Sequence, residues 1–257
     1  MIRIAFAFLV AFSLPGLAQQ VPSEIARAEL ETGWRQDGMH VAGLTIHLHA
    51  GWKTYWRAPG DAGIPPRFNW SGSDNIQSVR VQYPVPEVMD QNGVRSIGYH
   101  DGVTFPLWIK PKDAAAPIRL RGEIEIGVCE DICVPVTLRI GGRLPVGGQK
   151  TGPLSAILKD RPDVAKGLRC QISPITDGLQ MVAQIALPRM RGEEVAIIEV
   201  GNPEIWVSPP EVTRSGGVLT AQVEMVPPTA QPFALARSDV RMTVLAGGRA
   251  VEMLGCE

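Results

Sequence analysis

Short segments in which apolar and polar residues alternate dominate the first half of the chain. Residues 44–49, 121–128 and 134–140 follow this pattern. A period of two is expected of a β-strand that buries one face and exposes the other. Clusters of Gly, Pro, Asn, Asp and Ser, which favour turns, lie between the segments, at residues 58–61, 71–74, 91–93 and 141–142. Short strands at this spacing predict an all-β fold, an antiparallel sandwich or barrel.

The second half of the chain repeats the pattern after a break. Residues 141–152 are rich in Gly and are predicted to form a linker, and residues 153–160 are predicted to form a short helix with Pro153 at its first position. Further strands are expected at residues 179–186, 194–200, 218–225, 240–245 and 250–254. We therefore predict two tandem β domains, the second of about 100 residues, within the usual size range of a domain.

The N-terminal residues have the features of a secretory signal peptide. Arg3 precedes an apolar run over residues 4–14, which is too short to span a bilayer as a helix. The small residues Gly16 and Ala18 then fit a cleavage site. We expect cleavage after Ala18 and export to a compartment where disulfide bonds persist. No later segment of the sequence is apolar enough to predict a membrane span.

Composition argues against several classes of function. The chain has 25 basic and 26 acidic residues, a formal net charge of −1 and no basic run. Nothing in this balance favours binding to nucleic acid or to anionic lipid. The sequence also has no Ser-His-Asp arrangement, phosphate-binding glycine loop or zinc-finger spacing. We expect no cofactor and no resident metal ion.

Cys129 and Cys133 are the strongest candidates for chemistry. Only three residues separate them, so a disulfide between them removes little entropy from the unfolded chain, and stabilisation alone does not account for it. Strand alternation places both side chains opposite the apolar residues of segments 121–128 and 134–140. We therefore expect both sulfurs to be accessible on a hairpin, where the thiolate of a partner can attack them.

Glu130 and Asp131 lie in the loop between the two cysteines. Their negative charges disfavour a thiolate, so we expect the reduced cysteines to keep their protons until a partner docks. The spacing alone leaves two other interpretations open. One is a purely structural hairpin disulfide, and the other is a pair of soft ligands for Cu(I), completed by a histidine or a methionine.

Two further pairs of residues have candidate roles. Cys170 and Cys256 lie at the two ends of the second half, and a bond between them would contribute about 4–5 kcal/mol through chain entropy. We interpret this pair as a structural disulfide that joins the terminal strands, with a second redox or metal role as the alternative. His47 and His49 share the polar face of one strand, a spacing that suits either metal chelation or simple solvation.

Four motifs are specific enough to indicate a family. They are residues 51–63 (GWKTYWRAPGDAG), 65–73 (PPRFNWSGS), 98–99 (GY) and 128–135 (VCEDICVP). Together they resemble the N-terminal periplasmic region of the DsbD/ScsB family, the thiol:disulfide interchange proteins and the related suppressors of copper sensitivity. The resemblance covers residues 25–145 with specific motifs and continues more loosely to residues 247–252 (GGRAVE). The Cys-x3-Cys spacing is similar to the ScsB-like form.

The resemblance implies a fold and an activity. In that family the domain is an immunoglobulin-like β-sandwich, and its two cysteines accept electrons from a membrane-embedded thiol reductase and reduce periplasmic thioredoxin-fold proteins. Carried over, it makes Cys129 and Cys133 the redox pair of a periplasmic protein-disulfide reductase component. Full-length members continue into a transmembrane conduit and a thioredoxin-like domain, which this sequence lacks. We therefore expect a separate membrane protein to supply the electrons.

Aromatic residues are the candidates for a cap or a docking surface. In the family, a loop shields the cysteines from stray oxidants, and residues 88–101 are the candidate here, with Tyr99 lying over the sulfurs. Trp52, Tyr55 and Trp56 cluster after a predicted strand and could line a docking surface for a partner. Packing in the core is the alternative for such side chains.

The expected layout has four parts. Residues 1–18 form the signal peptide, 19–145 a sandwich similar to the DsbD N-terminal domain, 146–165 a linker with a short helix, and 166–257 a second sandwich-like domain. The leading hypothesis is thiol–disulfide exchange through Cys129 and Cys133. The alternatives are a copper-handling module that combines these cysteines with exposed histidines, and a non-catalytic binding or adaptor module with the same fold.

Overall fold

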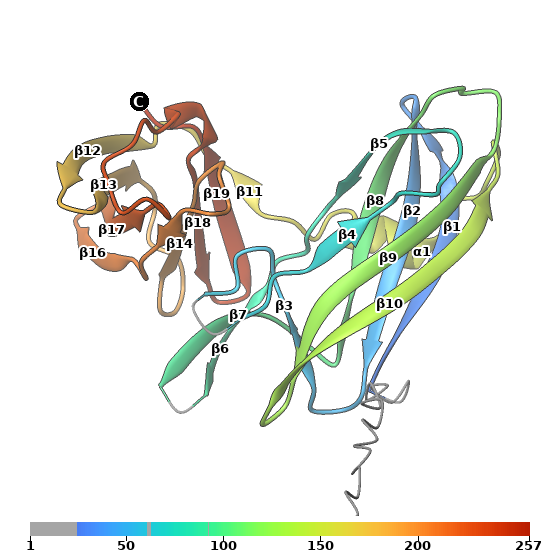
Figure 1. Cartoon of the computed structure of the whole chain (residues 1–257), viewed down its shortest axis with the longest axis horizontal. Coiled ribbons are helices and arrows are strands. Elements are labelled where there is room, and N and C mark those ends of the chain that lie inside the picture. Colours follow the sequence, from blue (N-terminus) through green and yellow to red (C-terminus); the bar gives the residue numbers. More distant parts are fainter. Residues whose placement is uncertain (1–24, 61–62, 92) are drawn as a thin grey trace, which may run out of the picture.

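The computed structural model describes residues 25–60, 63–91 and 93–257, so the predicted signal peptide lies outside the described residues. Within these ranges the chain forms four β-sheets, which confirms the all-β fold (Figure 1). Residues 26–144 build two of the sheets and residues 163–254 build the other two. No helix in the described part of the chain has the length and apolarity needed to cross a membrane.

The first two sheets are antiparallel and face each other. One has the strand order β1-β2-β8-β5, and the other has the order β10-β9-β3-β7-β6 with β4 paired to β9. Leu44, Phe105 and Ile124 are among the wholly buried residues of the core between them. The strands are β1 Ala26–Gln36, β2 Met39–Leu48, β3 Lys53–Tyr55, β4 Arg67–Asn69, β5 Ile76–Val81, β6 Glu87–Gln91, β7 Val94–His100, β8 Gly102–Pro111, β9 Ile118–Cys129 and β10 Cys133–Leu144.

The other two sheets have a core of their own, which includes Met181, Leu219 and Met242. Their strand orders are β11-β19-β18-β14 and β12-β13-β17-β15, with β16 paired to β17. A short helix α1 (Gly152–Ile157) precedes them, and a 3-10 turn (Arg237–Asp239) precedes β18. The strands are β11 Asp163–Val164, β12 Arg169–Ile175, β13 Gly178–Ala186, β14 Val195–Glu199, β15 Trp206–Val207, β16 Glu211–Ser215, β17 Val218–Val226, β18 Arg241–Ala246 and β19 Arg249–Leu254.

The turn expected at residues 141–142 is absent, because β10 continues through both glycines to Leu144. Gly142 pairs with Leu120, and a Cβ atom on Gly142 would come 2.7 Å from the Cδ2 atom of Leu30. The glycine therefore leaves space for the side chain of a facing strand instead of forming a turn. The predicted linker starts after Leu144, and its last strand, β11, pairs in parallel with β19.

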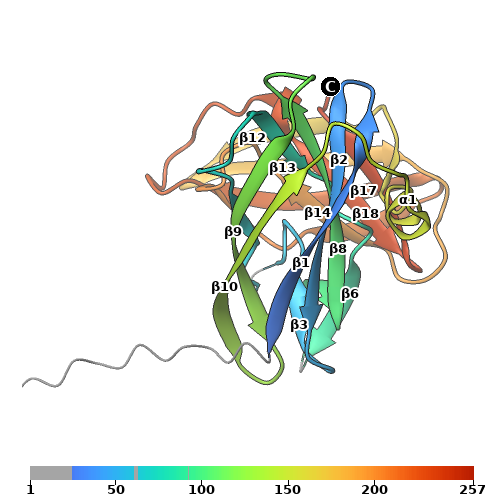
Figure 2. The same cartoon turned by 90° about the vertical axis from the view of Figure 1, so that its right-hand side faces the viewer.

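The two halves of the chain lie side by side (Figures 1 and 2). The β6–β7 hairpin of the first half faces the β18–β19 hairpin of the second half across a pocket of about 470 Å³. An ion pair of 2.7 Å between Arg95 and Glu193 lies at this pocket. Strand β7 thus carries both Ile97, in the core of the first half, and Arg95, which bonds to the second half.

His40 is a buried titratable residue in β2, and its Nε2 atom contacts the carbonyl oxygen of Thr32. Burial lowers the pKa of His40; the bond to Thr32 opposes the shift, and the charge of Arg35 adds to it. As the pH falls, the imidazole of His40 is therefore protonated in the unfolded chain before it is protonated in the folded chain. The contribution of neutral His40 to stability is complete above about pH 6.5 and is lost as the pH falls below that value.

We expect acidification from pH 7.5 to pH 5.5 to lower the free energy of unfolding through His40, by at most about 1.4 kcal/mol. Urea unfolding at the two pH values measures the change. The His40→Gln variant removes the titrating group, so its unfolding should depend less on pH. An equal dependence in both proteins would contradict the assignment to His40.

Candidate functional site

A disulfide bond joins Cys129 to Cys133 at the turn of the β9–β10 hairpin. The two residues are the last of β9 and the first of β10, and they face each other across the antiparallel pair, with Cα atoms 4.2 Å apart. Directly opposed residues in an antiparallel pair approach this closely, so the hairpin brings the sulfurs together without rearranging its strands. Residues 130–132 form the loop between them and are all exposed.

The two cysteines differ in exposure. Cys133 is exposed, as the sequence predicts, but Cys129 is only 1% exposed, so the prediction of two accessible sulfurs is wrong for Cys129. The strand alternation itself holds, since core residues such as Val128 point to the opposite face. Cys129 is buried because strand β3 pairs with β9, and the side chains of β3 cover the face that was expected to meet solvent.

Tyr55 on β3 covers the disulfide. Its hydroxyl group lies 2.9 Å from the Sγ atom of Cys129 and 3.2 Å from that of Cys133, so it donates to sulfur. Gly127 makes the approach possible, because a Cβ atom there would lie 3.2 Å from the Tyr55 ring and 2.7 Å from Ile64. Burial raises the pKa of Tyr55, which keeps the hydroxyl protonated and able to donate at neutral pH.

A small pocket of about 240 Å³ opens beside Cys129. Lys53 lies opposite Cys129 in the sheet, and its Nζ atom donates to the Oε1 atom of Gln91 over 2.7 Å. Gln91 in turn donates to the carbonyl oxygen of Glu130 over 3.3 Å. These bonds connect β3, β6 and the loop of the disulfide hairpin. The β6–β7 hairpin, which coincides with most of the candidate cap segment 88–101, therefore forms one wall of the pocket.

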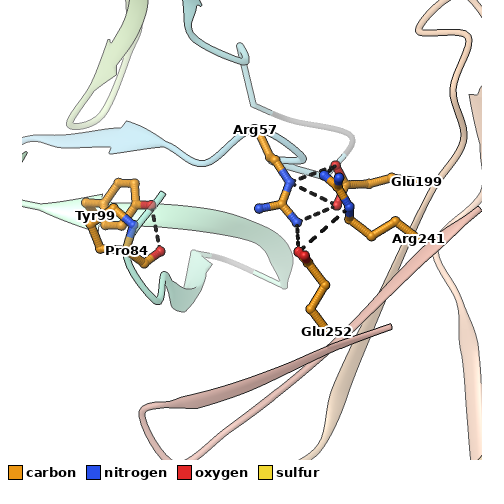
Figure 3. Close-up of polar contacts among 6 residues, drawn as sticks. All are labelled: Arg57, Pro84, Tyr99, Glu199, Arg241 and Glu252. Atoms are coloured by element: carbon orange, nitrogen blue, oxygen red, sulfur yellow. Dashed lines mark hydrogen bonds and ion pairs between the residues drawn. The ribbon is translucent and has the colours of Figure 1, made fainter. Parts of the chain in front are cut away.

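Tyr99 occupies a different position from the expected one. It lies opposite Thr54, which is itself paired with Val128, so its side chain points to the core side of the sheet and not over the sulfurs. Its hydroxyl group donates to the carbonyl oxygen of Pro84 over 3.0 Å (Figure 3). Burial raises the pKa of Tyr99 well above the usual value. Tyr55, and not Tyr99, is the tyrosine at the disulfide.

The neighbouring tryptophans belong to the core of the first half. Trp56 is wholly buried, and Trp52 is partly buried against the same core. Tyr55 is 2% exposed. Trp56 and Tyr55 therefore do not offer a docking surface. Trp56 packs in the core, which was the alternative considered for this cluster. The exposed apolar side chain at the disulfide is Ile132, which is 70% exposed in the loop between the cysteines.

A second disulfide joins Cys170 to Cys256, as expected, with Cα atoms 5.7 Å apart. Cys170 lies in β12, and Cys256 follows β19, so the bond connects two different sheets. The backbone of the same segments adds a hydrogen bond of 3.0 Å from Cys170 to Glu257. These contacts agree with a structural role, which remains a prediction.

His47 and His49, the histidines expected as possible metal ligands, are not among the residues that line the pocket beside Cys129. The Nε2 atom of His47 is 3.0 Å from the Oε2 atom of Glu29, and His49 is exposed beyond the end of β2. Among the residues that the structure describes, no group of three or more His, Cys, Asp or Glu side chains is placed to hold a metal ion.

Three residues of the site have no role predicted from the sequence. Lys53 and Gln91 line the pocket, and Arg57 bonds to Glu199 and Glu252 of the second half. Lys53, Tyr55 and Arg57 alternate along the chain, which is a signal for a shared strand face. Their partners, however, are 38 to 195 residues away. No local pattern specifies pairs at such separations.

Comparisons with known proteins identify a family for the first half of the chain and a solved structure with the same fold. Residues 18–141 match the family described as "Thiol:disulfide interchange protein DsbD, N-terminal". The solved structure of the N-terminal periplasmic domain of ScsB from Proteus mirabilis has the same fold, with a TM-score of 0.64 at 19% identity, over 93% of this chain and 97% of that chain. A comparison with curated protein sequences gives no match. Residues 18–141 of this chain therefore belong to the DsbD N-terminal domain family.

Proposed function

We propose that this chain is an exported periplasmic thiol–disulfide exchange protein that serves as a component of a protein-disulfide reductase. One observation carries the proposal: the exposed sulfur of Cys133 is bonded to the buried sulfur of Cys129, and the hydroxyl of Tyr55 reaches both. The family of residues 18–141 supports the same activity. Solvent-exposed disulfides are the ones that partners reduce most readily.

Cys133 is the sulfur that an incoming thiolate attacks. In thiol–disulfide exchange, attack on one sulfur breaks the S–S bond and expels the other sulfur as a thiolate. Because Cys133 is exposed and Cys129 is covered, the mixed disulfide forms on Cys133 and the electron pair of the broken bond leaves with Cys129. Tyr55 donates a hydrogen bond to the thiolate that forms on Cys129, which then takes a proton from solvent.

The remaining steps complete a two-electron cycle. The second thiol of a membrane-embedded dithiol reductase attacks the mixed disulfide, which oxidises the reductase and leaves Cys129 and Cys133 as thiols. Cys133 then attacks the disulfide of a periplasmic thioredoxin-fold protein, and Cys129 resolves the new mixed disulfide. Two electrons and two protons pass from the reductase to the client, and the Cys129–Cys133 bond is restored.

The β6–β7 hairpin is the proposed cap of the site. Its residues Met89 and Gln91 line the pocket beside Cys129, and Gln91 bonds to both Lys53 and the disulfide loop. In this position the hairpin limits the access of small oxidants to Cys129 from the side of β6, while Cys133 stays open to a docking partner. Displacement of Gln91 by such a partner would open the pocket.

The proposed layout is a signal peptide at residues 1–18 followed by two tandem immunoglobulin-like β-sandwich domains, at residues 19–145 and 166–257. The second half has a hydrophobic core of its own, which supports this division. The segment 146–165, proposed as the linker, contains the short helix α1. Strand β11, at its end, pairs with β19 and so belongs with the second domain.

Trapping of a mixed disulfide tests the proposed activity. The reduced Cys129→Ser variant keeps the exposed nucleophile but lacks the resolving thiol, so we expect it to accumulate a mixed disulfide with an oxidised periplasmic thioredoxin-fold protein. The Cys133→Ser variant is the matched control, and we expect at least tenfold less adduct because its remaining thiol is buried. Non-reducing electrophoresis and mass spectrometry measure both adducts.

The reduction potential of the wild-type pair provides the second criterion. Equilibration with glutathione or dithiothreitol buffers, followed by thiol alkylation, measures it. We expect a value above about −300 mV, the upper bound typical of structural disulfides. A lower potential combined with no trapped adduct from either variant would exclude an exchange function and leave a structural hairpin disulfide.

A further inference from the structure

A cluster of four charged side chains lies between the two halves of the chain (Figure 3). Arg57 lies two residues after the end of β3, next to Trp56. It donates from Nε and Nη2 to the carboxylate of Glu199, each over 2.9 Å. Its Nη2 atom also donates to the Oε2 atom of Glu252 over 2.5 Å. Arg241 completes the cluster, with nitrogen atoms 4.0 Å from Glu199 and 3.8 Å from Glu252. Two positive charges thus face two negative charges.

The cluster is largely removed from solvent. The side chains of Arg57, Glu199 and Glu252 are 16%, 19% and 25% exposed. Burial lowers the pKa of Arg57, but the charges and hydrogen bonds of Glu199 and Glu252 outweigh it and raise the pKa. A two-pronged bond between an arginine and a carboxylate fixes the orientation of the guanidinium group as well as its position. Arg57 is therefore held in place by two strands of the second half, β14 and β19.

Three consecutive residues connect this cluster to the disulfide. The guanidinium group of Arg57 stacks on the ring of Trp56, 4.0 Å from the ring centre. Trp56 is wholly buried, and its backbone nitrogen donates to the carbonyl oxygen of Ile97 over 2.9 Å. Tyr55, the next residue, reaches both sulfurs. Two residues of extended chain span about 7 Å, so little slack remains between the cluster and the Tyr55 backbone.

We propose that Arg57 is a positioning residue for thiol–disulfide exchange, and that Glu199 and Glu252 of the second half act through it to hold the Tyr55 hydroxyl at Cys129. The inference rests on the proposed function, because it explains how fast the disulfide reacts. It also gives the second half of the chain a part in the chemistry: this half supplies the anchor for the segment that carries the hydrogen-bond donor.

The double variant Glu199→Gln/Glu252→Gln in the full chain tests the proposal. It removes both negative charges while keeping side-chain size. The readout is the rate constant for reduction of the Cys129–Cys133 disulfide by dithiothreitol at pH 7.5, followed by alkylation and mass spectrometry. We expect the rate to fall about three- to tenfold, because the donor to the leaving sulfur is no longer held in position.

A double-mutant cycle separates positioning from general destabilisation. If Glu199 and Glu252 act through Tyr55, the same two substitutions should change the rate by less than twofold in the Tyr55→Phe background, where no donor is left to position. Glu193→Gln is the matched control. It removes the charge of the exposed Arg95–Glu193 pair between the same two halves without touching Arg57, and it should leave the rate unchanged.

Several outcomes would overturn the proposal: an unchanged or increased rate in the double variant, an equal decrease in both backgrounds, or an equal decrease in Glu193→Gln. If circular dichroism shows that the double variant does not fold, Arg57→Lys replaces it, since lysine keeps the charge but loses the two-pronged bond. Dithiothreitol needs no biological partner. Failure of the mixed-disulfide trap would therefore reject the proposed function, whereas these rates decide the inference.

Discussion

Replacement of both Cys170 and Cys256 by serine is expected to lower the free energy of unfolding by about 4–5 kcal/mol. The bond closes a loop with a sequence separation of 86, and the entropy that a disulfide removes from the unfolded chain grows with the logarithm of loop length. It also connects β12 to the segment after β19, which lie in different sheets. Its loss should therefore destabilise the second half of the chain.

Two spectroscopic signals can locate this effect. Five of the six tryptophans precede residue 145, so tryptophan fluorescence reports mainly on the first half, whereas circular dichroism reports on both halves. In urea, we expect the variant to show an early transition in circular dichroism that fluorescence largely misses. The Cys129→Ser/Cys133→Ser variant is the control, with an expected loss of only about 2 kcal/mol for its short loop. Equal losses in the two variants would contradict the loop-length argument.

The Tyr55→Phe variant is expected to be reduced by dithiothreitol about 10 to 100 times more slowly than the wild type. A hydrogen bond to a charged group contributes about 1.5–3 kcal/mol, and each 1.4 kcal/mol changes a rate tenfold. The hydroxyl lies 2.9 Å from Cys129, the sulfur that leaves as a thiolate in the proposed reaction. Phenylalanine keeps the ring that covers Cys129, so the variant isolates the contribution of the hydroxyl.

Tyr99→Phe is the matched control for this experiment. Tyr99 is also a buried tyrosine whose hydroxyl group donates a hydrogen bond, but that bond goes to Pro84 on the core side of the sheet. We expect its loss to cost about 1 kcal/mol of stability and to leave the reduction rate unchanged. The comparison also decides between the residue that the family resemblance favoured and the residue that the structure places at the sulfurs. A slow Tyr99→Phe with a normal Tyr55→Phe would reverse the assignment.

Local alternation predicted much of the fold, because a half-buried strand imposes a period of two on its own sequence. Strands β9, β13 and β17 follow the rule and lie close to their expected limits. Strand β2 begins at Met39, five residues before the expected segment 44–49, because residues 40–44 are all buried and do not alternate. Strand β1 was not predicted from the sequence, because its register shifts between Glu31 and Trp34, where Gly33 has a positive φ of 62°. The bulge interrupts the alternation, so a scan for period two loses the strand.

The candidate site was predicted less completely, because its geometry depends on pairings between distant segments. The closeness of the two cysteines follows from a hairpin, which is local. The burial of Cys129, in contrast, depends on the pairing of β3 with β9, across 76 residues from Lys53 to Cys129. Gly127 adds a second long-range requirement, since it leaves the space that the Tyr55 ring occupies. Neither requirement appears as a pattern within one segment.

The direct succession of Tyr55, Trp56 and Arg57 has a thermodynamic consequence. Coupling between two sites is reciprocal: if the contact between the halves favours one state of the disulfide, that state favours the contact by the same factor. Tyr55 bonds to both sulfurs in the disulfide, whereas in the proposed reaction its hydroxyl group donates to Cys129 alone once the S–S bond has broken. Oxidised and reduced forms of this chain should therefore differ in how firmly their two halves associate. A partner that binds across the contact between the halves could then distinguish the redox states without touching a sulfur atom.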